Sequence, residues 1–165
     1  MNAKALCGIA GGLAGVAAGT LGYRRLQTGP AGCYQGQTIT CIDVQKNAPK
    51  PIGPYSSAVR TGNLIFCSGQ VALCPETGAL LGNGDVVAEA RQALSNVKGV
   101  LEGAGTSIDH VVKATVFLQH MEDFAKVNEV YAQAFQGHRP ARSAVEVAKL
   151  PKGALVEIEV IAVVE

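Results

Sequence analysis

Five polar residues stand at the ends of apolar segments and could act together on a small charged molecule. They are Tyr55, Ser68, Asn128, Arg142 and Glu157. An arginine presents a planar fork of donors that suits a carboxylate. A partly buried glutamate can take a proton from an attacking water, and tyrosine and serine hydroxyls can hold that water. These residue types indicate hydrolysis of a small carboxylate-bearing substrate, with no metal or cofactor.

The fingerprints of several other enzyme classes are missing from the sequence. It has no P-loop, no G-x-S-x-G, no H-E-x-x-H and no G-x-G-x-x-G. Its five cysteines are an odd number and include no C-x-x-C, and its three histidines stand apart from them. Neither a disulfide framework nor a zinc site is therefore indicated, and free thiols in a reducing compartment fit better.

The bulk composition is that of one globular domain. The chain has 165 residues, of which 48% are hydrophobic and 16% charged, so it can build a core. The formal net charge is +1, and aromatic residues make up 5% of the chain. A strong nucleic-acid site is not indicated by this balance.

The first 37 residues differ from the rest. Residues 5–23 carry no charge and are long enough to cross a bilayer, but their Ala and Gly supply little transfer energy. No acidic residue occurs in 1–42, which fits an organellar presequence. We therefore predict a targeting or anchor segment plus linker over 1–37 and a mitochondrial location. A membrane anchor, a secretory signal and a cytoplasmic location stay open as alternatives.

Two segments rich in Val, Ile and Ala lie near the end of the sequence. They cover residues 142–147 and 155–164, and Pro151 and Gly153 stand between them, which predicts a β-hairpin. Pairing of these strands would place four charged residues on one face: Arg142, Glu146, Glu157 and Glu159. Charges on a half-apolar face are costly unless they are paired or used. A solvated face with a chance ion pair is the alternative.

Helical periodicity marks two other segments. The first is predicted to begin at an Asp85 N-cap and to end at Gly103 and Gly105. The second is predicted over about residues 122–135, and Asn128 falls within its apolar stripe. We expect an Asn that faces the core to find hydrogen-bond partners there.

The order of elements is strand, hairpin, helix, strand, helix, hairpin. It predicts an α+β two-layer sandwich in which two helices cover one face of a mixed β-sheet. The other face of the sheet has apolar residues and is not covered by a helix, which favours association with further copies of the chain.

Several motifs in this order resemble the RidA family of YjgF-type reactive-intermediate deaminases. The resemblance covers residues 38–165, and its anchors are residues 52–56, 66–70, 123–131, 140–143, 150–152 and 156–159. It implies a chorismate-mutase-like fold and a homotrimer with sites at subunit interfaces. The implied reaction is hydrolysis of reactive 2-imino acids, formed from enamines such as 2-aminoacrylate, to 2-oxo acids and ammonia.

The resemblance also implies roles for the polar residues named above. Arg142 would bind the substrate carboxylate, and Glu157 would act as acid and base beside the attacking water. Ser68 is implied in catalysis, and the substrate-binding set is Arg142, Tyr55, Ser68, Gly69 and Asn128. Two features depart from the pattern, since Ala144 replaces a cysteine found in many relatives and the 135–140 loop is short. Some family members are described as endoribonucleases or translation inhibitors, and a non-catalytic binding or chaperone-like trimer is a further alternative.

Overall fold

The computed structural model describes residues 38–44 and 46–164. The predicted N-terminal segment, residues 1–37, lies outside these ranges. The strands are β1 (Ile39–Ile42), β2 (Ala58–Thr61), β3 (Leu64–Gln70), β4 (Val111–Leu118), β5 (Ala141–Glu146) and β6 (Val156–Val163), and the helices are α1 (Val86–Ala104) and α2 (Phe124–Phe135). Short 3-10 turns precede β4, α2 and β6.

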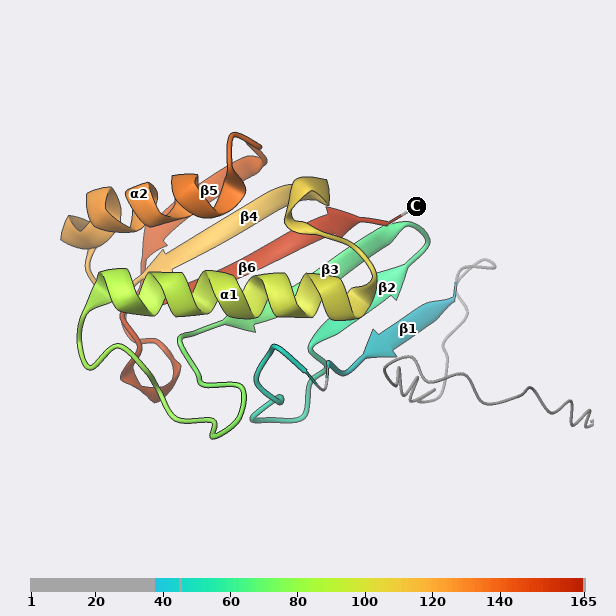
Figure 1. The fold of residues 1–165 in the computed structure, drawn as a ribbon, viewed down its shortest axis with the longest axis horizontal. Helices are drawn as coiled ribbons and strands as arrows, with labels where there is room; N and C mark the ends of the chain where they lie inside the picture. The colour runs from blue at the N-terminus through green and yellow to red at the C-terminus, as the bar shows by residue number, and fades with distance from the viewer. Residues whose placement is uncertain (1–37, 45, 165) are drawn as a thin grey trace, which may run out of the picture.

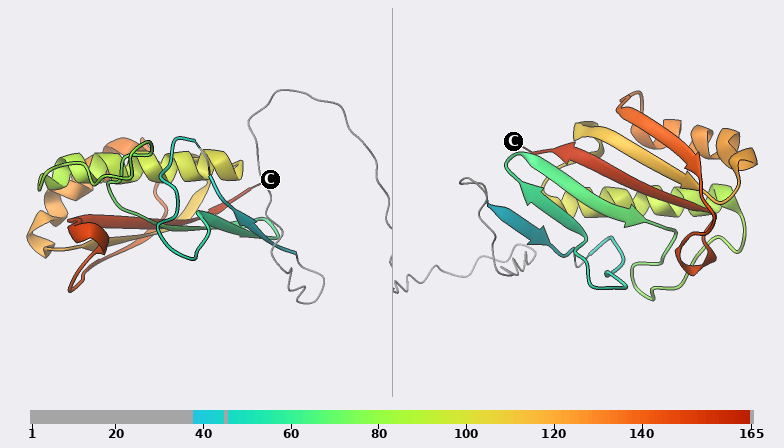
Figure 2. Two further views of the ribbon diagram at one scale, coloured as in Figure 1. Left: turned by 90° about the horizontal axis from the view of Figure 1, so that it is seen from below. Right: turned by 180° about the vertical axis from the view of Figure 1, so that it is seen from behind.

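The two helices lie side by side on one face of a single sheet (Figure 1). Seen from below, both helices form a layer above the strands, and the view from behind shows strands with no helix over them (Figure 2). The sheet is mixed, because β4 and β5 run parallel while all other pairs are antiparallel. The predicted α+β two-layer sandwich is therefore confirmed.

The strand order corrects the predicted C-terminal hairpin. The order is β1-β2-β3-β6-β4-β5, so β4 lies between β5 and β6 and the two predicted partners do not pair. Strands that follow one another in sequence are neighbours only about two-thirds of the time. The connection between β5 and β6 is long enough to place β6 on the far side of β4. The hairpin prediction was wrong because Pro and Gly residues indicate that the chain turns, but they do not show that the strands on either side of the turn pair with each other.

This order places Arg142 and Glu157 on opposite faces of the sheet. Ala114 pairs with both Arg142 and Val160, and Val160 is buried under the helices. Phe117 pairs with both Val145 and Glu157 on the uncovered face. Cross-strand partners share a face. The prediction that Arg142, Glu146, Glu157 and Glu159 share one face was therefore wrong, since the last two lie on the uncovered one.

The ends of α1 follow from local sequence. The Asp85 side chain accepts a hydrogen bond from the Val87 N–H at 2.9 Å, as an N-cap does. At the other end Gly105 adopts the left-handed conformation with φ 84°. Gly103 lies inside the helix instead of ending it, and a β-carbon there would meet the side chain of Val44.

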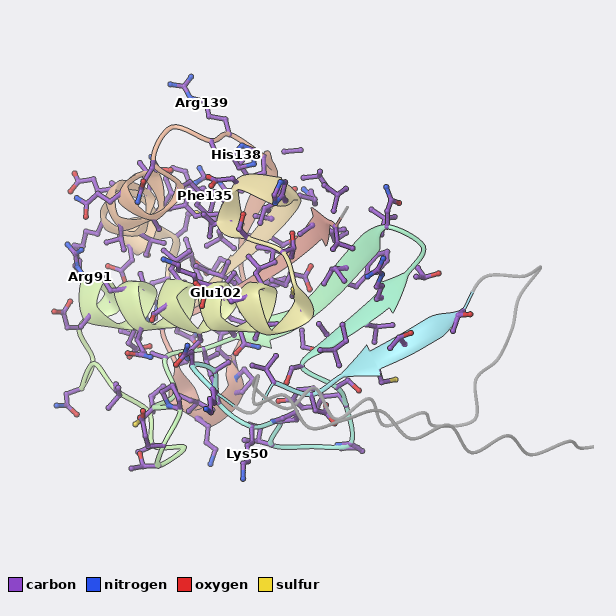
Figure 3. All side chains as sticks on the ribbon, turned by 45° about the vertical axis from the view of Figure 1, so that its right-hand side comes forward. Lys50, Arg91, Glu102, Phe135, His138 and Arg139 are labelled. Atoms are coloured by element: carbon purple, nitrogen blue, oxygen red, sulfur yellow. The ribbon has the colours of Figure 1, made fainter. Side chains whose placement is uncertain are left out.

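The main core fills the layer between the helices and the sheet, where side chains crowd together, while Lys50 and Arg139 project outward (Figure 3). A second, smaller cluster contains Val71, Leu73, Leu150 and Ala154. It joins the segment after β3 to the segment before β6.

Two polar side chains of α1 hold the same region together. Asn96 is fully buried and donates from its amide nitrogen to the carbonyls of Val71 at 3.0 Å and Leu73 at 2.8 Å. Glu89 is also buried and accepts from the Leu155 N–H at 2.7 Å. Because Leu155 precedes β6, this contact helps to fix the start of the strand that carries Glu157.

Candidate active site

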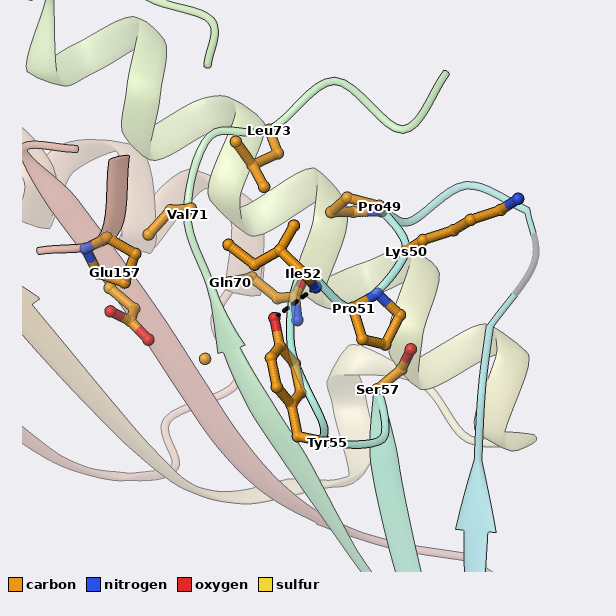
Figure 4. Close-up of a pocket in the computed structure, with 12 residues that line it drawn as sticks. Pro49, Lys50, Pro51, Ile52, Tyr55, Ser57, Gln70, Val71, Leu73 and Glu157 are labelled. Atoms are coloured by element: carbon orange, nitrogen blue, oxygen red, sulfur yellow. Dashed lines mark hydrogen bonds between the residues drawn. The ribbon is translucent and has the colours of Figure 1, made fainter. Parts of the chain in front are cut away.

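A pocket of about 210 Å³ opens where the Pro-rich loop before β2 meets the ends of β3 and β6 (Figure 4). Its lining residues are Pro49, Lys50, Pro51, Ile52, Tyr55, Ser57, Gly69, Gln70, Val71, Leu73, Pro151 and Glu157. Three predicted site residues meet there, namely Tyr55, Gly69 and Glu157. Each comes from a different part of the chain, so the fold and not the sequence order brings them together.

Glu157 supplies the acid of this pocket. Its side chain is half-buried on β6, and the loss of water raises the pKa of its carboxyl, with a further rise from the nearby charge of Glu159. The backbone of Gly69 lies against it so closely that a β-carbon at Gly69 would overlap the Glu157 carboxylate. A carboxyl with a raised pKa in a pocket can accept a proton and return it more readily than an ordinary surface carboxyl.

Tyr55 directs a hydroxyl toward the same space. Its Oη accepts a hydrogen bond from the Ile52 N–H at 3.2 Å, drawn as a dashed line in Figure 4. The rigid loop of residues 49–54 therefore sets the position of this oxygen. Because the oxygen is already an acceptor, the hydroxyl proton is free to be donated into the pocket.

Ser68 adjoins the pocket through Gly69 but is not part of its lining. Its Oγ donates a hydrogen bond to the Ser56 carbonyl at 2.7 Å, and its backbone N–H donates to the Ser57 carbonyl at 3.0 Å. The Ser68 hydroxyl thus ties β3 to the segment before β2. With its proton used in this way, the oxygen can only accept a hydrogen bond from a bound molecule.

Two buried polar residues of the pocket were missed from the sequence. Ser57 accepts from the Val44 N–H at 3.3 Å, and the Gln70 amide nitrogen donates to the Ser68 carbonyl at 3.0 Å. They are 2% and 6% exposed, respectively. A register shift between Cys67 and Gln70 breaks the simple alternation of faces, which is why the pattern of β3 did not reveal Gln70. Its place at the end of an apolar strand was the available signal.

Arg142 and Asn128 lie away from this pocket, on the helix-covered side of β5. The Arg142 Nη2 donates to the Asn128 Oδ1 at 2.8 Å. Asn128 is exposed on α2, so the expectation that it faces the core was wrong. It nevertheless has a hydrogen-bond partner, which is Arg142. The structure thus brings together two groups of predicted residues, one at the pocket and one at Arg142, and within one chain it separates them across the sheet.

The pocket of a single chain contains one basic residue among the described ones, Lys50. In Figure 4 its side chain extends away from Glu157. No group of three or more His, Cys, Asp or Glu residues suited to a metal ion occurs in residues 38–44 and 46–164. Among the helices of these same ranges, none has the length and apolarity needed to span a membrane.

A family model, two relatives and a solved structure are similar to this chain. Residues 45–164 match the model of the family described as Endoribonuclease L-PSP. A RutC family protein from Pyrococcus horikoshii is 54% identical over 117 residues, covering 71% of this chain and 92% of that protein. A Mus musculus protein named 2-iminobutanoate/2-iminopropanoate deaminase is 53% identical over 116 residues, covering 70% and 85%. The crystal structure of the YjgF gene product from Escherichia coli has a TM-score of 0.70 and 48% identity, covering 76% of this chain and 98% of that one.

Proposed function

Because the chain belongs to the RidA (YjgF-type) family, we propose that it hydrolyses small 2-imino acids to 2-oxo acids and ammonia. The name of the Mus musculus relative supports this activity at 53% identity. The observation that carries the proposal for this chain is the half-buried Glu157 carboxyl at the pocket, with its raised pKa. Imine hydrolysis needs one group that first takes a proton and then gives it back.

The reaction follows from the groups at the pocket. Glu157 takes a proton from water as the water oxygen bonds to the imine carbon, and the C=N bond becomes a single bond. The same carboxyl returns that proton to nitrogen, which gives a carbinolamine. It then carries the hydroxyl proton to nitrogen as well, so that the C=O bond forms, the C–N bond breaks and ammonia leaves. The Tyr55 hydroxyl donates a hydrogen bond to the attacking water or the substrate. No metal or cofactor takes part in these steps.

The substrate carboxylate needs a cation that one chain does not bring to Glu157. We propose that Arg142 of a neighbouring copy supplies it in a homotrimer. The uncovered sheet face supports association, because Phe66 and Val145 on it are 42% and 41% exposed. Exposed apolar surface of this kind marks interaction sites, and a bidentate Arg–carboxylate contact would orient the imino acid.

The test couples a threonine dehydratase to this protein and follows the release of 2-oxobutanoate and ammonia. Wild-type protein is expected to accelerate release, and Arg142→Ala and Glu157→Gln are each expected to lower the acceleration by at least about 100-fold. Retention of the wild-type rate by either variant would contradict the assigned roles. No acceleration by the wild type would refute the deaminase proposal.

A mixture of the two variants tests the shared site. If Arg142 and Glu157 come from different copies, refolding an equal mixture of Arg142→Ala and Glu157→Gln restores activity in about one quarter of the sites. If both residues act within one copy, the mixture stays inactive. The unmixed variants, refolded in the same way, are the controls.

RNA cleavage is the second reaction to assay, since the matching family model is described as an endoribonuclease. The near-neutral net charge of +1 gives it little support here. Cleavage that co-purifies with the wild type and is lost in Glu157→Gln, without any imine hydrolysis, would favour the nuclease. If the protein shows neither RNA cleavage nor imine hydrolysis, a binding or chaperone-like trimer is the function that is left.

The location of the protein remains a prediction about residues 1–37. Their lack of acidic residues supports an organellar leader, with the mitochondrion favoured. A fluorescent reporter fused to residues 1–37 tests this directly. Diffuse cytoplasmic fluorescence, or fluorescence retained in washed membranes, would contradict it.

A further inference from the structure

Three residues on one face of α2 surround the side chain of Arg142. Phe124, Asn128 and Tyr131 are four and three residues apart, so they line up along the helix. The Asn128 Oδ1 accepts a hydrogen bond from the Arg142 Nη2 at 2.8 Å. The guanidinium carbon lies 4.6 Å from the centre of the Tyr131 ring and 5.7 Å from that of Phe124. One amide and two aromatic faces therefore contact the guanidinium.

All three contacts are electrically neutral. Burial raises the pKa of Tyr131 to about 12, and the opposing effect of the Arg142 charge is the smaller one, so the phenol stays protonated. An amide oxygen and an aromatic face attract a cation without cancelling its charge. The positive charge of Arg142 is thus held in place and remains available to an anion.

Tyr131 acts here through its ring. Its hydroxyl oxygen is buried and has no hydrogen-bond partner among the described residues. The ring stacks on Phe135 with centroids 4.2 Å apart, which fixes its orientation beneath the guanidinium. A hydroxyl that makes no hydrogen bond adds nothing to the hold on Arg142, whereas a fixed aromatic face does.

We propose that Phe124, Asn128 and Tyr131 are positioning residues that fix the Arg142 guanidinium for binding of a carboxylate. The identity of that carboxylate, a 2-imino or 2-oxo acid, rests on the proposed function. This role for Asn128 differs from the substrate contact expected from the sequence. A guanidinium that is already held loses less conformational freedom when it binds an anion.

The first test measures binding of 2-oxobutanoate, and of its neutral amide, to the full-length protein by calorimetry. Asn128→Ala is expected to weaken binding of the acid about fivefold with little effect on the amide, because one hydrogen bond to a charged group is lost. Asn128→Asp is expected to weaken it by more than about tenfold, because the new carboxylate would pair with Arg142 and compete with the bound acid. Ala132→Ser, on the exposed side of α2, is the control.

Substitutions of Tyr131 separate the ring from its hydroxyl. Tyr131→Leu is expected to bind 2-oxobutanoate about threefold more weakly than Tyr131→Phe, since only the second keeps an aromatic face. Equal affinities of these two variants, or an Asn128→Asp variant that binds as tightly as wild type, would overturn the inference. Equal losses for the acid and the amide would overturn it as well, since they indicate a general distortion.

A second readout needs neither ligand nor turnover. The side-chain protons of Arg142 over the Tyr131 ring are expected to show a ring-current shift in NMR spectra of the full-length protein. Tyr131→Leu is expected to abolish this shift and Tyr131→Phe to keep it. If the shift follows this pattern while imine hydrolysis is absent, the proposed function fails and the positioning of Arg142 stands. If hydrolysis is present and the shift is absent from the wild type, the positioning inference fails alone.

Discussion

The contact between the Gly69 backbone and the Glu157 carboxylate leaves no room for any side chain at position 69. A β-carbon there would overlap the carboxylate, so Gly69→Ala must move Glu157 or the strand. We expect the variant to fold and to lose at least about tenfold in deaminase activity, since a small misplacement of an acid–base group is costly. Circular dichroism and the coupled assay measure the two effects. In a Glu157→Gln background the same Gly69→Ala change should cause little further loss of deaminase activity. A further loss of about tenfold would contradict this explanation.

Removing the charge of Glu159 is a way to change the pKa of Glu157. Burial raises that pKa first and the Glu159 charge raises it further. If ionised Glu157 is the base, activity falls as the pH drops through its pKa, and Glu159→Gln lowers the pKa by removing one cause of the rise. The acid limb of the profile of kcat/KM against pH should therefore move to lower pH.

A control for long-range charge effects is Glu102→Gln, at an exposed site on the outer side of α1. This substitution should leave the acid limb of the kcat/KM profile at the same pH as in the wild type. A Glu159→Gln profile that superposes on the wild type, or that shifts to higher pH, would show that Glu157 does not set the limb.

Several individual residues were predictable because their chemistry is local. Asp85 was identified as an N-cap from its place before an apolar periodic segment, and it caps α1. Asn128 was expected to need a partner, but its partner Arg142 comes from a strand that only the fold brings near. The roles of Tyr55, Ser68, Gly69, Asn128, Arg142 and Glu157 in a reaction stay predictions, since the geometry locates these residues without showing a substrate.

At the scale of elements, α1 holds the wall of the pocket through Asn96. Its two hydrogen bonds to the Val71 and Leu73 carbonyls are the buried link between the helix and the segment after β3. Asn96→Ala should lower the free energy of unfolding by about 2 kcal/mol, because the buried Leu73 carbonyl loses its donor while the Val71 carbonyl keeps only the Leu73 N–H. Urea unfolding at one fixed protein concentration measures this loss. Ser95→Ala, at the exposed neighbouring position, should change stability little, and an equal loss in both variants would contradict the assignment.

The elements themselves were more predictable than their arrangement. Periodicities of two and of three to four residues located the strands and both helices, because each depends on residues close in sequence. Strand order depends on contacts between distant segments, and the segments 142–147 and 155–164 contained no signal that β4 separates them. The separation of Arg142 from Glu157 followed from this order, so the sequence indicated candidate site residues but not the sides of the sheet on which they lie.

At the scale of the whole molecule, the uncovered sheet face is where the proposed homotrimer can be tested. Phe66 is exposed there, next to its cross-strand partners Val59 and Ile161. Phe66→Glu would bury a charge in an apolar interface, which costs several kcal/mol per copy. Light scattering should then show a mass of 17.0 kDa, that of one chain. Imine hydrolysis should disappear with the assembly.

Phe66→Leu keeps the face apolar and is expected to keep the assembled mass. The proposal of a trimer built on this face would be wrong if Phe66→Glu had the same mass as the wild type. It would also be wrong if a monomeric variant hydrolysed imino acids at the wild-type rate.

The position of β6 affects how a chain can fold while it is being made. β6 follows the other described strands in sequence, yet it lies in the middle of the sheet, between β3 and β4. On the ribosome, the β1–β3 and β4–β5 portions are therefore complete before the strand that joins them exists. Each portion then has an open edge, and open edges recruit strands from other chains. The nascent protein is accordingly most prone to aggregation in the interval before residues 156–163 emerge from the ribosome.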